Sequence, residues 1–219
     1  MTEILTQPHR EEPTVIEPEV RRALLPPFNN NCFVLVCPES NESVIIDAPS
    51  SPEAILELAA GTTVRYVVIT HRHGDHWGAL EAVKGATGAT VAVHPVDAHA
   101  LPVPMEYALN DGEDLAVGSL RFRILHTPGH TEGCVCLYTP GHLISGDTLF
   151  PNGPGRTMSP GDLDQVIESI HAKLIPLPDA TAVYPGHGDF TILGREKTRL
   201  AQFLASPRDP ALCGDVTWT

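Results

Sequence analysis

One strand and the loop that follows it constrain this chain most strongly. Residues 64–70 (VRYVVIT) are apolar and rich in β-branched side chains, which predicts a strand buried on both faces. The strand leads directly into His71-Arg72-His73-Gly74-Asp75-His76. A histidine-rich loop at the end of a buried strand is typical of functional groups held on a rigid scaffold.

The loop itself predicts metal binding. A H-x-H-x-D-H run arises by chance from this composition about once in 700 such chains. His71 and His73 are spaced to reach the same ion, whereas Asp75 and His76 lie at a turn into a helix and point to a second position. Imidazole nitrogens and carboxylate oxygens at this density suit zinc, iron or manganese.

The remaining pattern indicates one α/β domain. The chain has 219 residues, 42% of them hydrophobic, which is enough for a substantial core. Hairpins mix with βα units, a mixture that suits two mixed sheets covered by helices. We expect helices at 51–60, with Ser51 as N-cap and Pro52 in the first position, and at 75–84, 163–174 and 194–204. Further strands are expected at 32–37, 43–47, 90–93, 114–117, 120–126, 134–139, 142–145 and 182–184.

Charge and cysteine usage narrow the class of partner. The formal net charge is −13, which disfavours nucleic acid and anionic membranes as partners. Five cysteines without a C-x-x-C pair argue against a disulfide framework and a zinc finger. No secretory signal or apolar run of membrane-spanning length is present, so we expect a cytoplasmic protein, monomeric or homodimeric, with a small-molecule substrate.

Three more segments place chemistry-bearing residues after expected strands. They are Thr127-Pro128-Gly129-His130, Ser145-Gly146-Asp147-Thr148 and Tyr184-Pro185-Gly186-His187-Gly188. Together with the first motif and with Ile45-Ile46-Asp47, they resemble the metallo-β-lactamase-fold hydrolase superfamily from about residue 33 to 204. The resemblance implies a four-layer αββα sandwich of two mixed β-sheets flanked by helices. We expect this domain at 21–219, after a polar tail at 1–20 that is loose, pads a dimer or covers an edge strand.

The resemblance also implies the ligand sets. One divalent ion would be held by His71, His73 and His130, and a second by Asp75, His76 and His187. Asp147 would bridge the two ions, and Asp47 would orient the first motif without binding metal. Zinc is the first choice for both ions, with iron or manganese as alternatives.

Two segments are similar to the glyoxalase II (hydroxyacylglutathione hydrolase) branch, namely ISGDTLFPNGPGR at 144–156 and PGHGDFTILG at 185–194. A bridging Asp147 weighs against a β-lactamase, and Phe150 stands where lactonases of this fold have tyrosine. The branch's Gly-Cys-Gly-Arg is Gly-Pro-Gly-Arg here, and we expect the residues after 204 to be too few for its glutathione-binding helices.

The implied activity is hydrolysis of a small-molecule thioester by a hydroxide that two ions share, with Asp75 orienting the nucleophile. Arg156, Phe150 and Tyr107 are the candidate substrate contacts. The alternatives are a single-iron oxygenase resembling persulfide dioxygenases, and a hydrolase of lactones or other esters.

Overall fold

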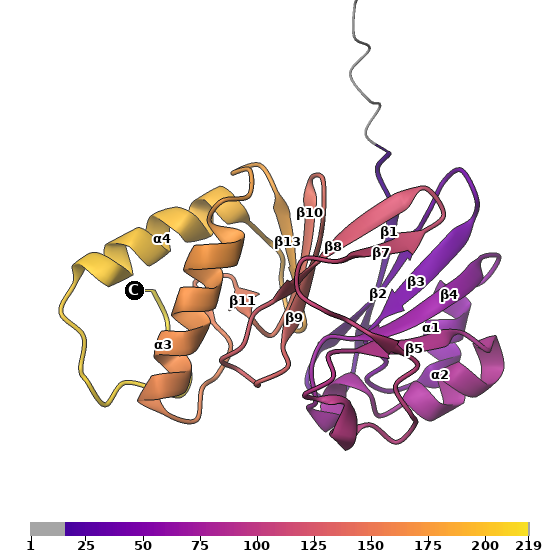
Figure 1. Cartoon of the computed structure of the whole chain (residues 1–219), viewed down its shortest axis with the longest axis horizontal. Coiled ribbons are helices and arrows are strands. Elements are labelled where there is room, and N and C mark those ends of the chain that lie inside the picture. Colours follow the sequence, from indigo (N-terminus) through magenta and orange to yellow (C-terminus); the bar gives the residue numbers. More distant parts are fainter. Residues whose placement is uncertain (1–15, 219) are drawn as a thin grey trace, which may run out of the picture.

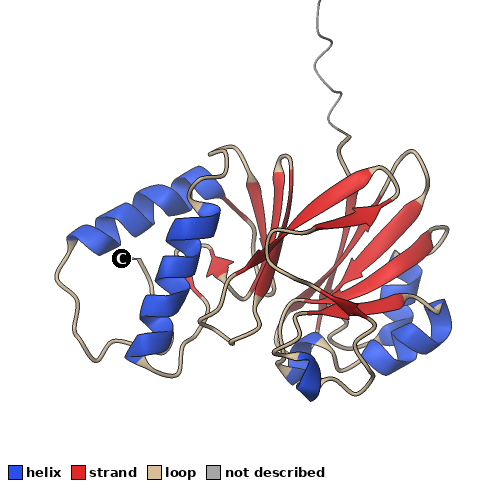
Figure 2. Cartoon of the chain, in the orientation of Figure 1, coloured by secondary structure: helices blue, strands red, loops and turns tan. Residues whose placement is uncertain are grey.

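The computed structural model describes residues 16–218. Its two six-stranded sheets lie face to face, with helices α1 and α2 beside one sheet and α3 and α4 beside the other (Figures 1 and 2). Residues 1–15 of the expected tail lie outside the described range. The first strand begins at Glu19, two residues before the expected start of the domain.

The first sheet contains the N-terminal half of the chain in the order β1-β2-β3-β4-β5-β6. Strands β1, β2 and β3 form an antiparallel meander, and β4, β5 and β6 then extend the sheet in parallel. Helix α1 (Pro52–Leu58) joins β3 to β4, and α2 (Leu80–Thr87) joins β4 to β5. The strands are Glu19–Leu25, Asn30–Val36, Glu42–Ile46, Thr63–Ile69, Thr90–Val93 and Tyr107–Ala108.

The second sheet has the order β14-β13-β10-β9-β8-β7. Its strands are Asp114–Val117, Leu120–His126, Val135–Thr139, His142–Gly146, Ala182–Pro185 and Thr191–Ile192 for β7, β8, β9, β10, β13 and β14. Helix α3 (Pro160–Ser169) joins β10 to β13 after a small hairpin, β11 (Leu149–Phe150) and β12 (Gly153–Pro154). Helix α4 (Leu193–Ala205) follows β14.

Three apolar clusters account for the four layers. One packs α1 and α2 against the first sheet, around Ile55, Ile69 and Leu80. A second fills the space between the sheets, where Phe33 and Phe122 are buried. The third packs α3 and α4 against the outer face of the second sheet. The predicted αββα sandwich is therefore the observed fold.

The expected helix at 75–84 is wrong in its position. Residues Gly74–His76 form a single 3₁₀ turn, and the α-helix begins only at Leu80. The loop after β3 contributes to this later start of the helix. The Ala48 amide donates to the His76 carbonyl, and the Ala48 carbonyl accepts from the Ala79 amide. These bonds hold residues 76–79 outside a helix and tie the metal motif to the neighbouring strand end.

Two other helices begin and end differently from expectation. Ser51 stands before α1 but has φ of 52° and makes no capping hydrogen bond through its side chain, since capping requires an extended residue there. Helix α3 begins at Pro160, earlier than expected, and residues Ile170–Leu174 continue it as a π-helical turn in which Ile175 donates to Ile170. The short strands β6, β11, β12 and β14 and the whole of β1 had no predicted counterpart.

The segment after α4 returns to the hairpin β11–β12. Gly214 exchanges two backbone hydrogen bonds with Thr157, and the Trp218 amide donates to the Asn152 carbonyl at 2.9 Å. The buried carboxylate of Glu196 accepts the Asn152 amide at 2.8 Å. The hairpin is thus fixed from α4 and from the C-terminal segment. Within the described part of the chain, no helix has the length and apolar character needed to cross a membrane.

Truncating a side chain between the two sheets should destabilise the whole sandwich. Phe122 is fully buried there, so Phe122→Ala should lower the free energy of unfolding by about 3–5 kcal/mol. Leu204→Ala is the matched control, because Leu204 on α4 is 40% exposed and its truncation should change stability by only about 0.5 kcal/mol. Urea unfolding followed by circular dichroism measures both. Equal losses in the two variants would contradict the assignment of the core.

Candidate metal centre

The candidate ligands lie at one end of the sandwich. His71 follows β4 and Asp47 follows β3, and these two strands are parallel. His130 follows β8, Asp147 follows β10 and His187 follows β13. Strands β10 and β13 are parallel, and β8 runs in the same direction because both β8 and β10 are antiparallel to β9. Strand ends far apart in the sequence therefore deliver their side chains to one place.

The first group contains three histidines. His71 Nε2 and His73 Nδ1 are 3.1 Å apart, and the ring of His130 lies 4.8 Å from that of His71 and 4.6 Å from that of His73. One nitrogen from each ring falls within 4.8 Å of the others, an arrangement that can hold a metal ion. His71 is fully buried, and His130 lies in the loop between β8 and β9.

The second group contains Asp75, His76 and His187, again with ligand atoms within 4.8 Å of one another. His76 Nε2 and His187 Nε2 are 3.1 Å apart, and Asp75 Oδ2 is 3.4 Å from His187 Nε2. Asp147 lies between the groups, because its carboxylate oxygens are 3.5 Å from Nε2 of His130, of His76 and of His187. The structure brings all the candidate ligands together.

The outer hydrogen bonds of the rings show that this cluster suits a cation. His76 Nδ1 donates to Asp47, His187 Nδ1 to the Phe28 carbonyl at 3.0 Å and His130 Nδ1 to the Arg156 carbonyl at 2.7 Å. In neutral rings these bonds leave the Nε2 lone pairs turned inward. His130 Nε2 and Asp147 Oδ1 are buried and have no hydrogen-bond partner among the described residues. Facing lone pairs beside a carboxylate require a proton or a metal ion between them.

The electrostatics of the cluster point the same way. Burial lowers the pKa of His71 well below its ordinary value, and the neighbouring His76 lowers it further. Burial would also lower the pKa of His76, but Asp147 and Asp47 raise it well above the ordinary value. Burial would raise the pKa of Asp147, yet His76 and His187 hold it well below its usual range. The neutral His71 ring and the ionised Asp147 carboxylate are forms that bind metals. The raised pKa of His76 favours its protonated form, so a metal ion that binds this ring displaces a proton.

Asp47 makes the contacts expected of an orienting carboxylate. Its Oδ1 accepts the Thr70 amide at 2.8 Å, and its Oδ2 accepts the Thr70 hydroxyl at 2.9 Å and His76 Nδ1 at 2.8 Å. Asp47 has φ of 58°, a left-handed conformation that is costly for a non-glycine residue and that persists where surrounding contacts enforce it.

Sequence reasoning missed two residues that hold the ligand loops. Asn30 on β2 donates its amide to Oδ2 of Asp75 at 3.1 Å and to the Asp75 carbonyl at 2.9 Å. Asp97 is fully buried and bonds both to Arg72 and to Thr131, the neighbours of three ligands. Asp97 follows β5, the strand next to β4, and this position at a parallel strand end was the available signal. Asn30 offered none, because its strand was expected only from residue 32.

The three candidate substrate contacts lie in different surroundings. The ring of Phe150 stacks at 6.3 Å from that of His187, so this side chain lies beside the metal centre. Arg156 contributes its carbonyl to His130, while the residue itself is exposed. Tyr107 on β6 packs edge-on against Tyr66 with ring centres 5.7 Å apart, at the margin of the core between the sheets. Tyr107 is not brought to the metal cluster by any contact seen among the described residues.

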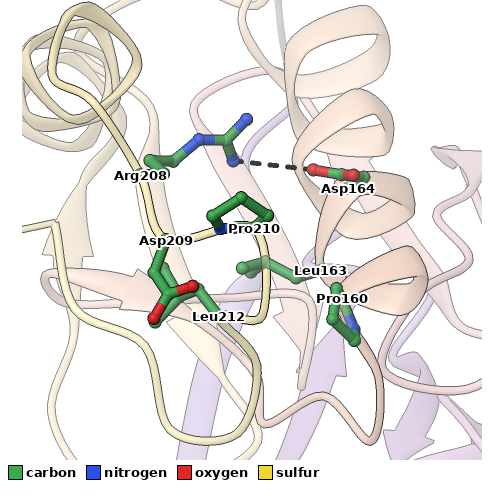
Figure 3. Close-up of a pocket in the computed structure, with 7 residues that line it drawn as sticks. All are labelled: Pro160, Leu163, Asp164, Arg208, Asp209, Pro210 and Leu212. Atoms are coloured by element: carbon green, nitrogen blue, oxygen red, sulfur yellow. Dashed lines mark ion pairs between the residues drawn. The ribbon is translucent and has the colours of Figure 1, made fainter.

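A separate cavity of about 370 Å³ lies between the start of α3 and the segment after α4 (Figure 3). Arg208 and Asp164 face each other across it at 3.6 Å. The residues that line it are Pro160, Leu163, Asp164, Arg208, Asp209, Pro210 and Leu212, none of which is a candidate ligand. The cavity is therefore distinct from the metal centre.

Comparison with known families agrees with the fold and the ligand pattern. Residues 25–187 match the model of the metallo-β-lactamase superfamily, and the chain belongs to this superfamily. A hydroxyacylglutathione hydrolase of Maricaulis maris is 36% identical over 164 residues, which cover 73% of this chain and 62% of that protein. The match therefore spans less than two thirds of that relative. An uncharacterized protein of Aquifex aeolicus is 34% identical over 78% of this chain and 90% of its own length.

Solved structures with different names share this fold. ETHE1 from Myxococcus xanthus has a TM-score of 0.78 at 28% identity, covering 88% of this chain and 87% of that one. The B3 metallo-β-lactamase BLEG-1 has a TM-score of 0.76 at 31% identity, covering 82% of this chain and 97% of that one. TTHA1623, solved in a di-iron-bound form, has a TM-score of 0.71 at 32% identity, covering 80% of this chain and 96% of that one.

A methyl group at Gly186 should disturb the centre without removing a ligand. A Cβ there would lie 2.1 Å from Asp147 Oδ1 and 2.7 Å from His76 Cε1, so Gly186→Ala must displace the Asp147 carboxylate. We expect about 10-fold or greater loss of metal affinity, measured by metal analysis after dialysis against a chelator. Gly85→Ala on α2 is the control, because its Cβ would meet no atom within 4 Å. Unchanged affinity in Gly186→Ala would argue against Asp147 as a ligand.

Proposed function

We propose that this protein is a metal-dependent hydrolase of small-molecule thioesters, using two divalent ions held by the two ligand groups. The observation that carries the proposal is the position of Asp147, 3.5 Å from histidines of both groups. A carboxylate between two complete donor groups can bind an ion in each of them, whereas a single ion would need only one group. The hydroxyacylglutathione hydrolase relatives support the thioester class.

In the proposed reaction the metal ions and the residues of the site have separate roles. When bound by these residues, divalent ions would supply a hydroxide near neutral pH and would polarise the carbonyl of the substrate. Asp75 lies on the more open side of the centre, with its side chain 29% exposed, and Asn30 holds its Oδ2. In that position the Asp75 carboxylate can accept a hydrogen bond from an attacking water and orient it.

The surroundings of the centre support a substrate with an apolar part. Phe150 presents its ring beside His187, and the exposed Arg156 follows in the next loop, where its guanidinium is available to a carboxylate. Zinc suits the histidine-rich groups, and the di-iron form of TTHA1623 makes iron the first alternative. All five cysteines are free, which supports a reducing, cytoplasmic location.

A second candidate is oxygenase chemistry on a persulfide with a single iron. The structural likeness to ETHE1 favours it, since the TM-score of 0.78 extends over 88% of this chain. The discriminating quantities are the number of ions per chain and the consumption of oxygen. Two ions with thioester hydrolysis support the first proposal, and one iron with oxygen uptake on a persulfide supports the second.

Metal removal and a ligand variant test the hydrolase directly. A chelator-stripped sample and the variant His73→Ala should each lose thioester hydrolysis by more than about 100-fold, because even outer-shell changes cost about 10–100-fold. Readdition of zinc or iron should restore the stripped wild type. His171→Ala is the matched control, since this histidine lies in the turn after α3, away from the ligand groups. The native protein should first be analysed for metal and then assayed on thioester, lactone, β-lactam and persulfide substrates.

Full thioesterase activity without metal would contradict the proposal. Hydrolysis of β-lactams or lactones in preference to thioesters would keep a metal-dependent hydrolase and overturn the substrate class.

A further inference from the structure

The carboxylate of Asp97 is buried next to the metal centre and, like that of Asp47, accepts three hydrogen bonds. Its Oδ1 accepts Arg72 Nη1 at 2.8 Å. Its Oδ2 accepts the Arg72 amide at 3.0 Å and the Thr131 hydroxyl at 2.6 Å. The side chain is fully buried, and a Cβ on Gly133 would come within 2.5 Å of its Cγ, so the surrounding loop is packed closely around it.

These three bonds join two loops that are far apart in the sequence. Arg72 stands between His71 and His73, and a fixed Arg72 amide fixes the peptide that links it to His71. Thr131 directly follows His130. One carboxylate thus holds the loops that carry the whole three-histidine group, while its three hydrogen bonds go to Arg72 and Thr131 and not to the rings.

Asp47 has a complementary position. It bonds to His76 and to Thr70, and so directly fixes a ring of the second group. The two buried aspartates lie after β3 and β5, on either side of β4, the strand that delivers the histidine motif. The sheet therefore places one orienting carboxylate on each flank of that motif. Asp47 bonds to His76 directly and reaches His71 through the Thr70 hydroxyl, which lies 3.1 Å from His71 Nδ1. Asp97 bonds to the neighbours of the three-histidine group.

We propose that Asp97 is the positioning residue of the three-histidine group and sets the metal affinity of that group selectively. The proposal rests on the proposed two-ion centre only in that it assigns Asp97 to one of its two positions. Outer-shell carboxylates around histidine ligands affect metal affinity by about 10–100-fold, and an effect of this size is expected for the loss of the Asp97 charge.

The test uses Asp97→Asn in two backgrounds that each leave one ligand group intact. His187→Ala leaves the three-histidine group, and His130→Ala leaves the second group with Asp147. In the His187→Ala background, Asp97→Asn should lower the affinity for the remaining zinc ion by about 10–100-fold, measured by competition titration with a chelator. In the His130→Ala background it should change zinc affinity by less than about 3-fold. Equal weakening in both backgrounds would overturn the proposal and make Asp97 a general support of the fold.

Single substitutions in the intact site keep the proposal testable if a double variant does not fold. Thr131→Val removes the hydroxyl that donates to Asp97, whereas Thr131→Ser keeps it. A chelator titration should resolve two zinc-binding steps, one for each ion. In Thr131→Val the zinc affinity of one step should fall, and in Thr131→Ser both affinities should equal those of the wild type. A valine variant with both steps unchanged would contradict the proposal.

A matched carboxylate checks for effects of charge alone. Asp111 accepts the His126 amide at 2.9 Å and pairs with Lys173, and it contacts neither ligand loop. Asp111→Asn should leave both zinc-binding steps unchanged, and a shift as large as that of Asp97→Asn would contradict the assignment. A wild type that holds only one zinc would refute the two-ion centre, while the His187→Ala comparison would still decide the role of Asp97.

Discussion

Buried hydrogen bonds between carboxylates and loop backbones hold the metal centre together. The ligands come from loops after β4, β8, β10 and β13, where a single 3₁₀ turn at Gly74–His76 is the regular structure among the described residues that carries any of them. Asp47 and Asp97 replace the missing backbone pairing by accepting bonds from Thr70, Arg72 and Thr131. An ionised carboxylate that accepts several donors is a strong anchor in a buried site, because each bond is charge-assisted. The sandwich supplies rigid strand ends, and the two aspartates fix the positions of the loops that carry the candidate ligands beyond those ends.

Local patterns predicted most of this architecture. The β-branched run at 64–70 and the alternation in β7 and β8 reflect burial of one or both faces, so the strands and the layered fold followed from the sequence. The helix expected at 75–84 was misplaced because backbone bonds from Ala48, distant in the sequence, hold residues 76–79. The seven candidate ligands share short motifs at strand ends, which made them visible. Asp97 and Asn30 act through tertiary contacts without a motif, and Tyr107 was selected by residue type alone.

The relatives and the geometry answer different questions. The family model and the solved structures identify the superfamily and its fold, and hydroxyacylglutathione hydrolase, ETHE1 and BLEG-1 are all similar to this chain at 28–36% identity. Such a range of names on one scaffold shows that fold alone does not choose the substrate. In this chain the features that bear on the substrate are local: a carboxylate between two complete ligand groups, a phenylalanine beside His187, and an arginine in the loop that also supports His130.

The return of the C-terminal segment to the hairpin β11–β12 has a consequence for how this site can change. Gly214 and Trp218 bond to Thr157 and Asn152, on the same stretch of chain that carries Phe150 and Arg156. The C-terminal segment is therefore coupled through the backbone to the stretch that carries the proposed substrate contacts. Sequence change in this segment offers a way to reshape the surface offered to substrate while the seven ligands stay constant, so specificity and metal binding can vary independently within one domain.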